Sequence, residues 1–379
     1  MQFKDIVGQK EVKTKLIKSV KEGRIAHAQL LAGHEGTGKL ALAIAYAQFI
    51  SCQNKSDNDS CGECPSCHKY QKLIHPDLHF VFPVNETKKE DDDEKTGKGS
   101  DAHLRQWREA ILSNPYFTES QWYSTIGLEN KLGIISTSEG SEVIKKISLK
   151  SFEAEYKVMV IWLPERMNLF AANKLLKLIE EPPEKTVFLM VSEHPNSIIG
   201  TILSRTQIIK VPPISREAIA AALVERFSIT PSKAHDFSRV ANGNYQKAMS
   251  LALSDDTSPY FELFRDLMRA CFTNNVLKLM DWVDKASRLN REKQKEMLSY
   301  SNGIIRESFM LNLGLEDIVY IAGEEKDFSL KFAPFINGDN ILHVYNTFNL
   351  ATEHISRYGN PQIIFTDMAM KLVKLINKK

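Results

Sequence analysis

The chain has 379 residues, of which 43% are hydrophobic and 25% are charged, so we expect a soluble globular protein of two or three domains. Lys and Arg total 49 against 47 Asp and Glu, and the net charge of +2 excludes a global electrostatic attraction to nucleic acid. We expect a cytoplasmic protein without a membrane partner, because the sequence has no apolar targeting segment and no run approaching roughly 18 apolar residues.

The first strong motif is a phosphate-binding loop that lacks one functional residue. Residues 33–40 read Gly-His-Glu-Gly-Thr-Gly-Lys-Leu, after an apolar run at 29–32, which predicts a strand, and before an Ala-rich run at 40–45, which predicts a helix. In the complete motif a Ser or Thr after the Lys ligates Mg²⁺, whereas Leu40 offers no ligand. The residues expected to contact phosphate are Gly33, Gly36, Thr37, Gly38 and Lys39. Binding of ATP or ADP stays open, and an ordinary glycine turn is the alternative.

Four of the five cysteines follow in the compact pattern C-x8-C-x2-C-x2-C. They are Cys52, Cys61, Cys64 and Cys67. Structural disulfides are rare in the cytosol, and four thiolates at this spacing can close a tetrahedron around one Zn²⁺. Such a site leaves no position for water, so it predicts a structural metal. A redox role for the CxxC pairs is the weaker alternative, and Cys271 is expected to be a small core residue.

The next stretch separates a polar loop from the regular part of the chain. Residues 88–95 are a run of charges followed by Gly and Ser, which predicts a flexible acidic insertion at about 85–105. Aromatic residues return between Trp107 and Trp122, so we expect this stretch to pack on the domain. From Phe261 onward apolar residues recur three and four apart, which predicts an all-helical C-terminal part.

Two continuous apolar runs indicate a parallel sheet. Residues 157–163 and 186–192 are apolar and rich in β-branched side chains, which is typical of strands buried on both faces. The run at 171–181 between them predicts a helix, which must stop before Pro182 and Pro183. Alternating strands and helices predict an α/β domain.

The order of these pieces resembles the bacterial DNA polymerase III clamp-loader family of AAA+ proteins, and within it the delta-prime type. The resemblance rests on FKDIVGQ at 3–9, RIAHA at 24–28, the phosphate-binding loop, the four cysteines, AANKLLKLIEEPP at 171–183 and TILSRT at 201–206. It implies an α/β AAA+ P-loop domain at 1–211 with an inserted zinc knuckle at 52–67. A small helical lid domain at 212–258 and an all-α collar domain at 259–379 are implied to follow.

The resemblance also implies a subunit without ATPase activity of its own. Hydrolysing gamma/tau members carry an Asp and a Glu at the end of a strand and a nucleotide-sensing Arg in the lid, where this chain has Trp162, Leu163 and Gln246. The delta-prime type instead supplies an arginine finger to a neighbouring subunit. Arg205, which follows Ser204, matches that residue. The implied partners are gamma/tau and delta subunits in a hetero-pentamer, with the sliding clamp and primed DNA reached through the assembled complex.

Two other functions fit parts of the sequence. An active AAA+ ATPase of the gamma/tau type is the first, and the missing hydroxyl and both missing acids count against it. A zinc-bearing nucleic-acid-binding module is the second, and the balanced charge argues for a structural metal instead. The segment at about 85–145 is longer than the family pattern leads us to expect, and the sequence assigns it no role.

Overall fold

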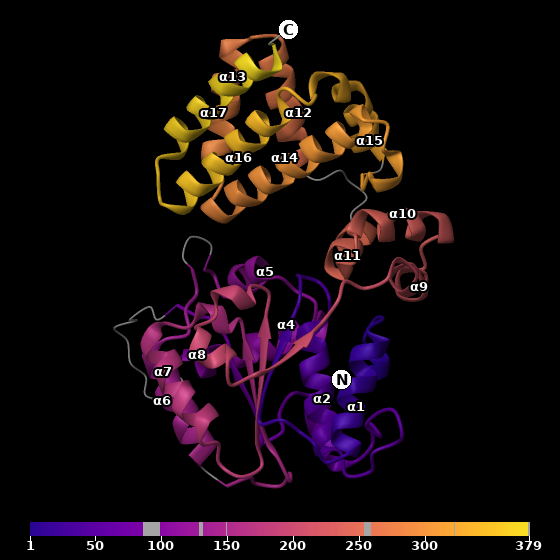
Figure 1. The fold of residues 1–379 in the computed structure, drawn as a ribbon, viewed down its shortest axis with the longest axis vertical. Coiled ribbons are helices and arrows are strands. Elements are labelled where there is room, and N and C mark those ends of the chain that lie inside the picture. Colours follow the sequence, from indigo (N-terminus) through magenta and orange to yellow (C-terminus); the bar gives the residue numbers. More distant parts are fainter. Residues whose placement is uncertain (86–98, 129–131, 149, 254–258, 322, 378–379) are drawn as a thin grey trace. The chain divides into compact units, whose positions relative to one another are not determined.

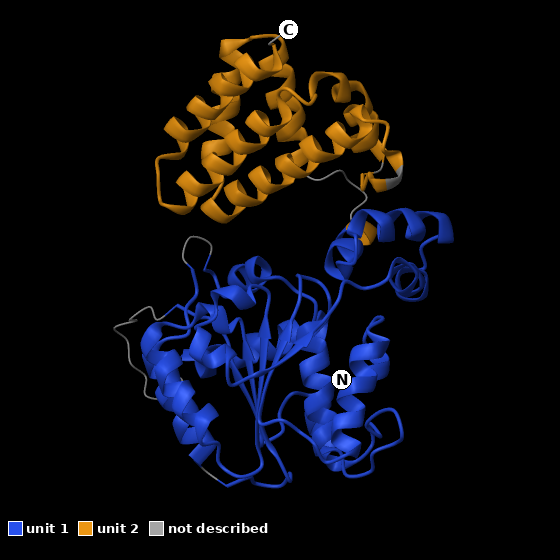
Figure 2. Cartoon of the chain, viewed as in Figure 1, with its two compact units in different colours: residues 1–250 blue, residues 251–379 orange. Residues whose placement is uncertain are grey.

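The computed structural model of the protein divides into two compact units, residues 1–250 and residues 251–379 (Figure 2). The described residues are 1–85, 99–128, 132–148, 150–253, 259–321 and 323–377. Each unit has its own hydrophobic core. Within the described residues, no helix combines the length and the apolar composition that a bilayer crossing requires.

The first unit is built on a five-stranded parallel sheet (Figure 1). The strands are β1 Ala28–Ala32, β2 Leu78–Val81, β3 Lys157–Trp162, β4 Thr186–Ser192 and β5 Gln207–Lys210. Their order across the sheet is β2-β3-β4-β1-β5, and every neighbouring pair is parallel. The predicted parallel α/β fold is thereby confirmed. It places β1, which leads into the phosphate-binding loop, between β4 and β5.

The inner strands contribute side chains to two hydrophobic cores, one on each face of the sheet. In β3, Val158, Val160 and Trp162 belong to one core, whereas Met159 and Ile161 belong to the other. Side chains alternate between the faces of a strand, so a strand covered on both faces needs apolar residues at every position. This is the physical reason for the unbroken apolar run in the sequence.

Helices from the first unit cover both faces. The first core includes residues of α1 Lys10–Lys21, α2 Lys39–Ser51, α4 Leu104–Ser113 and α5 Glu119–Thr125, and the second includes residues of α6 Thr137–Ser148, α7 Leu169–Glu180 and α8 Gly200–Leu203. All residues of α2 are buried. Its many alanines have small side chains, which suit a helix that is surrounded on all sides.

The aromatic stretch packs on the domain as predicted. Trp107 and Trp122 are fully buried, and the Trp107 ring lies 4.1 Å from the ring of Phe82. The charge run at 88–95 lies outside the described residues. The insertion was expected to stay flexible to about residue 105, and this part is wrong, because residues 99–103 form a 3-10 turn.

The physical reason for this difference is a buried contact. Ser100 is inaccessible to solvent, and its backbone N–H donates to Glu139 Oε2 on α6 at 2.8 Å. The Ser100 hydroxyl also donates to the carbonyl of Phe82 at 3.3 Å. These bonds hold Ser100 against α6 and against Phe82, the residue that follows β2.

The remaining elements are helical in the described residues. After β5 come α9 Arg216–Phe227, α10 Pro231–Ala241 and α11 Tyr245–Leu253, which we call the α9–α11 segment. The second unit contains α12 Pro259–Phe272, α13 Val276–Ser287, α14 Arg291–Asn312, α15 Gly323–Phe332, α16 Ile341–Ser356 and α17 Pro361–Ile376. Cys271 is fully buried in the core of this unit, which confirms the predicted core role.

Candidate functional site

The four cysteines predicted as metal ligands come together in one cluster. Their Sγ atoms all lie within 4.8 Å of one another, with 3.6 Å between Cys52 and Cys61 and 3.8 Å between Cys61 and Cys67. Zn–S bonds of about 2.3 Å in a tetrahedron place the sulfurs about 3.8 Å apart, whereas a disulfide needs about 2.05 Å. All five cysteines of the chain are free thiols. The cluster therefore has the donor set and spacing of a structural zinc site.

Backbone N–H groups point at the sulfurs of this cluster. The N–H of Cys61 donates to Cys52 Sγ at 3.3 Å, that of Cys64 to Cys61 Sγ at 3.3 Å, and that of Cys67 to Cys64 Sγ at 3.4 Å. The N–H of Glu63 also donates to Cys61 Sγ at 3.5 Å. Donation by Glu63 above all lowers the pKa of Cys61 to about 6, whereas burial raises the pKa of Cys52 and of Cys67 against the effect of their backbone donors. These bonds stabilise thiolates, which are the form of Cys that binds metal.

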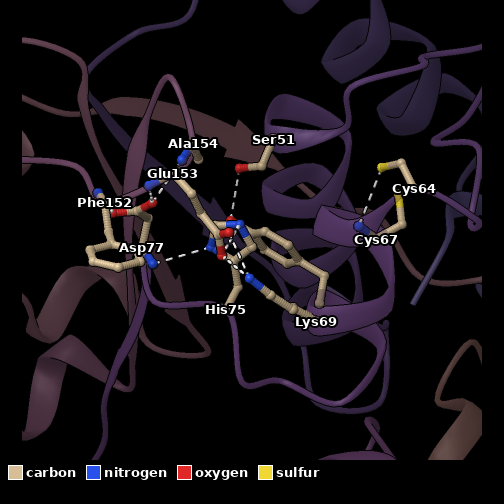
Figure 3. A network of polar contacts seen from close by, with 10 residues as sticks. Ser51, Cys64, Cys67, Lys69, His75, Asp77, Phe152, Glu153 and Ala154 are labelled. Atoms are coloured by element: carbon tan, nitrogen blue, oxygen red, sulfur yellow. Dashed lines mark hydrogen bonds and ion pairs between the residues drawn. The ribbon is translucent and has the colours of Figure 1, made fainter.

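A polar network beside the cluster links the helix that carries Cys67 to the residues that precede β2 and β3 (Figure 3). Helix α3 Pro65–Gln71 carries Cys67, and its Lys69 Nζ lies 2.6 Å from Glu153 Oε2 in the chain leading to β3. Asp77, just before β2, accepts backbone N–H bonds from Phe152 at 2.6 Å and Ala154 at 2.8 Å. Burial opposes ionisation of Asp77, but these donors outweigh it and the pKa of Asp77 lies below its usual value. The helix that carries Cys67 is thus tied to the residues that precede β2 and β3.

The phosphate-binding loop has the predicted setting, between β1 and α2. Gly36 and Gly38 adopt φ values of 69° and 81°, which favour glycine. A Cβ on Gly33 would lie 2.3 Å from the carbonyl oxygen of Val211, so this glycine is also required by close packing. The Thr37 hydroxyl donates to the carbonyl of His34 at 2.8 Å within the loop. The structure therefore brings the five predicted loop residues together.

Lys39 is engaged by groups of the chain itself. Its side chain is only 4% exposed, and its Nζ lies 3.6 Å from Glu193 Oε1 and donates to the carbonyl of His34. Burial lowers the pKa of Lys39, and the charge of Glu193 opposes this change. Burial also raises the pKa of Glu193, against the effect of Lys39. The motif does not reveal Glu193, whose one signal is its place after β4, the neighbour of β1.

Apolar side chains stand where the family pattern implies the Mg²⁺ ligands, at Leu40 and Trp162, and the catalytic Glu, at Leu163. Leu40, Trp162 and Leu163 are all buried, and the Trp162 ring lies 5.3 Å from the ring of Phe117. The carboxylate of Glu165 follows β3 closely, but its Oε1 accepts the backbone N–H groups of Glu193 and His194 at 3.0 and 3.1 Å. This carboxylate holds the end of β4 in place.

Ser204 and Arg205 lie at the C-terminal end of α8, away from the loop in sequence. The Arg205 side chain is 42% exposed, and its Nε lies 2.8 Å from Glu180 Oε1 at the end of α7. One of its terminal nitrogens, Nη1, donates to the carbonyl of Thr201 at 3.1 Å and to Ser204 Oγ at 3.2 Å. The guanidinium group is therefore presented on the surface with one carboxylate partner, which sequence reasoning missed.

Comparison with known proteins identifies the family. A profile of the family described as "DNA polymerase III, delta subunit" matches residues 8–215. DNA polymerase III subunit delta' of Bacillus subtilis is 27% identical over 241 residues, covering 64% of this chain and 58% of that protein. DNA polymerase III subunit gamma of Buchnera aphidicola is 27% identical over 57% of this chain and 47% of that protein. Subunit delta' of Yersinia pestis is 31% identical, over 48% of this chain and 41% of that protein. Because the family match covers more than half of the sequence, this chain belongs to the DNA polymerase III delta subunit family of AAA+ clamp-loader proteins.

Proposed function

We propose that this chain is the delta-prime subunit of the replicative DNA polymerase III clamp loader. In this role it hydrolyses no ATP, helps to hold the loader together, and supplies an arginine finger to a neighbouring ATPase subunit. The sliding clamp is then loaded onto primed DNA by the assembled complex with gamma/tau and delta subunits. The observation that carries the proposal is that buried apolar side chains, Leu40, Trp162 and Leu163, stand where the family pattern has the Mg²⁺ ligands and the catalytic Glu.

The chemistry of phosphoryl transfer makes this observation informative. A P-loop ATPase needs a hydroxyl and a carboxylate to hold Mg²⁺ and a group that positions the attacking water. Relatives named delta', gamma and tau all match this chain, so similarity alone does not separate the inert type from the hydrolysing type. The residues around the loop favour the inert type, because an indole and two isobutyl groups can perform none of these tasks.

Arg205 is the group that would act in trans. Its exposed guanidinium group offers a planar fork of N–H donors, which can neutralise charge on transferring phosphoryl oxygens. Ser204 Oγ and the carbonyl of Thr201 accept hydrogen bonds from Nη1 and so help to orient it. We assign Arg205 as the arginine finger, with Ser204 as a positioning residue.

We further propose that the cysteine cluster holds one structural Zn²⁺ through Cys52, Cys61, Cys64 and Cys67. When bound, the ion would clamp the knuckle at 52–67 on the AAA+ domain at 1–211. Within this proposal the α9–α11 segment belongs to the lid domain at 212–258. The helices beyond it form the collar domain at 259–379, through which the subunits assemble.

The decisive experiment places Arg205 variants in a reconstituted loader. We expect Arg205→Ala to assemble normally and to slow ATP hydrolysis about a thousandfold at the one site it serves, measured in a complex whose other arginine fingers have been removed. Arg205→Lys should restore little, because an ammonium group lacks the bidentate fork. Arg105→Ala is the matched control, since Arg105 is also an exposed arginine paired with a glutamate, Glu109.

Two results would contradict the proposal. Full ATP hydrolysis by the Arg205→Ala complex would remove the role in trans. ATP turnover by the isolated parent chain, abolished in Lys39→Ala, would remove the inert assignment and favour the gamma/tau type instead.

A further inference from the structure

The loop between α4 and α5 reaches the phosphate-binding loop from a distant part of the sequence. We call residues 114–118 the plug segment. We propose that the plug segment, together with Asn244 and the first residues of α11, occupies the phosphate-binding loop, and that this internal occupant excludes nucleotides and fastens the α9–α11 segment to the sheet domain. This goes beyond the proposed function, because a subunit that cannot hold Mg²⁺ can still bind ADP.

Tyr116 is the centre of the plug segment. Its side chain is buried, at 4% exposure, and its Cε1 would lie 2.9 Å from a Cβ placed on Gly38. The Tyr116 hydroxyl accepts the backbone N–H of Val7 at 2.9 Å. Its ring meets the ring of Tyr245 edge to face, with 4.9 Å between centroids. Burial raises the pKa of Tyr116 to about 12, so the phenol is neutral in this apolar contact.

The glycine at the other turn of the loop, Gly36, is covered by Asn244, which immediately precedes α11, and by Tyr245, the first residue of α11. A Cβ on Gly36 would lie 1.8 Å from Asn244 Oδ1, and the backbone N–H of Tyr245 donates to the carbonyl of Gly36 at 3.0 Å. Asn244 Nδ2 donates to Glu35 Oε1 at 3.1 Å. In a nucleotide-binding loop such glycines let phosphates approach the backbone closely. Here protein atoms make that close approach.

Side-chain amides join the two parts of the occupant. Asn114 Nδ2 donates to Gln246 Oε1 at 2.6 Å, and Gln246 Nε2 donates to Gln121 Oε1 on α5 at 3.1 Å. Gln246 is 6% exposed, so both ends of its amide need partners inside the protein. Asn114 Oδ1 also accepts the backbone N–H of Tyr116 at 3.0 Å, which fixes the tyrosine in place.

These contacts have one consequence for binding and another for motion. A nucleotide on the loop would have to displace the Tyr116 ring and the Asn244 amide, losing buried apolar contact and hydrogen bonds together. The same bonds hold α11 against the loop without any ligand. The plug segment, which belongs to the long insertion for which the sequence suggests no role, thereby takes the place of a bound nucleotide at the loop.

The test measures binding of a fluorescent ADP analogue to the full chain, with and without Mg²⁺. We expect no saturable binding to the parent or to Tyr116→Phe, which keeps the ring and loses only the bond from Val7. Tyr116→Ala and Asn114→Ala should instead bind the analogue saturably, with a Kd at least about tenfold below the highest concentration tested on Tyr116→Phe, and unlabelled ADP should displace it. Tyr123→Ala is the matched control for the loss of a buried tyrosine, since Tyr123 bonds to Glu119 and Gly133 instead.

Hydrogen exchange provides a measurement that does not require removal of the large Tyr116 side chain. In Asn114→Ala, the amides of residues 33–40 and 114–118 should lose protection together, whereas ADP should leave the parent unchanged. Saturable ADP binding by the parent would overturn the proposal. It is also overturned if folded Tyr116→Ala and Asn114→Ala, checked by circular dichroism, bind the analogue no better than Tyr116→Phe.

Discussion

At the cysteine cluster, four sulfur atoms lie within 4.8 Å of one another and receive hydrogen bonds from backbone N–H groups. At the phosphate-binding loop, by contrast, the Lys39 ammonium group is paired with Glu193 and with the carbonyl of His34. Both regions keep the backbone geometry that their motifs predict. The cluster keeps four sulfur donors for a metal ion, whereas the lysine of the loop is already paired with groups of the protein itself.

The difference teaches that a motif specifies a backbone shape, and that the surrounding fold decides whether the shape is available. The cysteine ligands all come from one short stretch, residues 52–67, so little else in the fold can intervene. The phosphate-binding loop is bordered by Tyr116, Glu193 and Asn244, which come from three distant parts of the chain. Four predictions can break or sharpen this comparison, and they follow from the largest expected effect to the smallest.

Loss of the metal should give the largest effect. We expect the parent to contain one equivalent of zinc and Cys64→Ser to contain none, because three thiolates leave the tetrahedron open. Structural zinc sites have apparent binding free energies of roughly 10–16 kcal/mol, so this variant should show the greatest loss of thermal stability. Elemental analysis and calorimetry make the measurement, and Cys271→Ala should keep its zinc. A parent protein that is free of metal and equally stable would remove the site.

Removal of the loop lysine should destabilise the fold. In Lys39→Ala the carboxylate of Glu193 loses its partner in a largely buried position, and breaking such a pair costs on the order of 3 kcal/mol. Urea unfolding measures this difference. Adding Glu193→Gln to Lys39→Ala should recover part of the loss, because no unpaired charge is then buried. Unchanged unfolding of Lys39→Ala would show a lysine free for ligands and would erase the contrast with the cluster.

His79 in β2 lies outside both regions and provides a reference for how stability depends on pH. Burial, with Lys146 and Lys157 nearby, lowers the pKa of His79 from 6.5 to about 4. Below pH 6.5 the imidazole of His79 is protonated in the unfolded chain, whereas in the folded chain it stays neutral down to about pH 4. The free energy of unfolding should therefore decrease as the pH is lowered from 6.5 to about 4, by up to about 1.4 kcal/mol per pH unit. Urea unfolding of His79→Gln should show a shallower slope, and an identical slope would contradict the assignment.

The exposed pair of Arg205 with Glu180 should contribute least. Both side chains are about two-fifths exposed, and exposed ion pairs are worth about 0–1 kcal/mol. We expect Glu180→Gln to unfold in urea within about 1 kcal/mol of the parent, in contrast to the buried pair of Lys39. A larger loss would mean that Arg205 is fixed in the fold and is not free to act on a neighbour.

Much of the fold follows from local patterns. The apolar runs that became β3 and β4, the glycine spacing before α2 and the three- and four-residue periodicity after Phe261 each report on neighbours in sequence. The cysteine spacing likewise specifies a cluster, since its ligands are joined by short turns. These predictions succeed because strand alternation, helix period and turn chemistry act over a few residues.

The sequence alone determined the parallel α/β fold, the glycine loop before α2, the cysteine cluster and the helical C-terminal unit. Only the tertiary structure decided what the loop touches. Tyr116 and Asn244 reach Gly38 and Gly36 from residues far along the chain, and the expected flexibility near residue 105 was wrong because Ser100 is buried against Glu139. Contacts of this kind depend on how separate elements pack in space, and no local period or spacing encodes them.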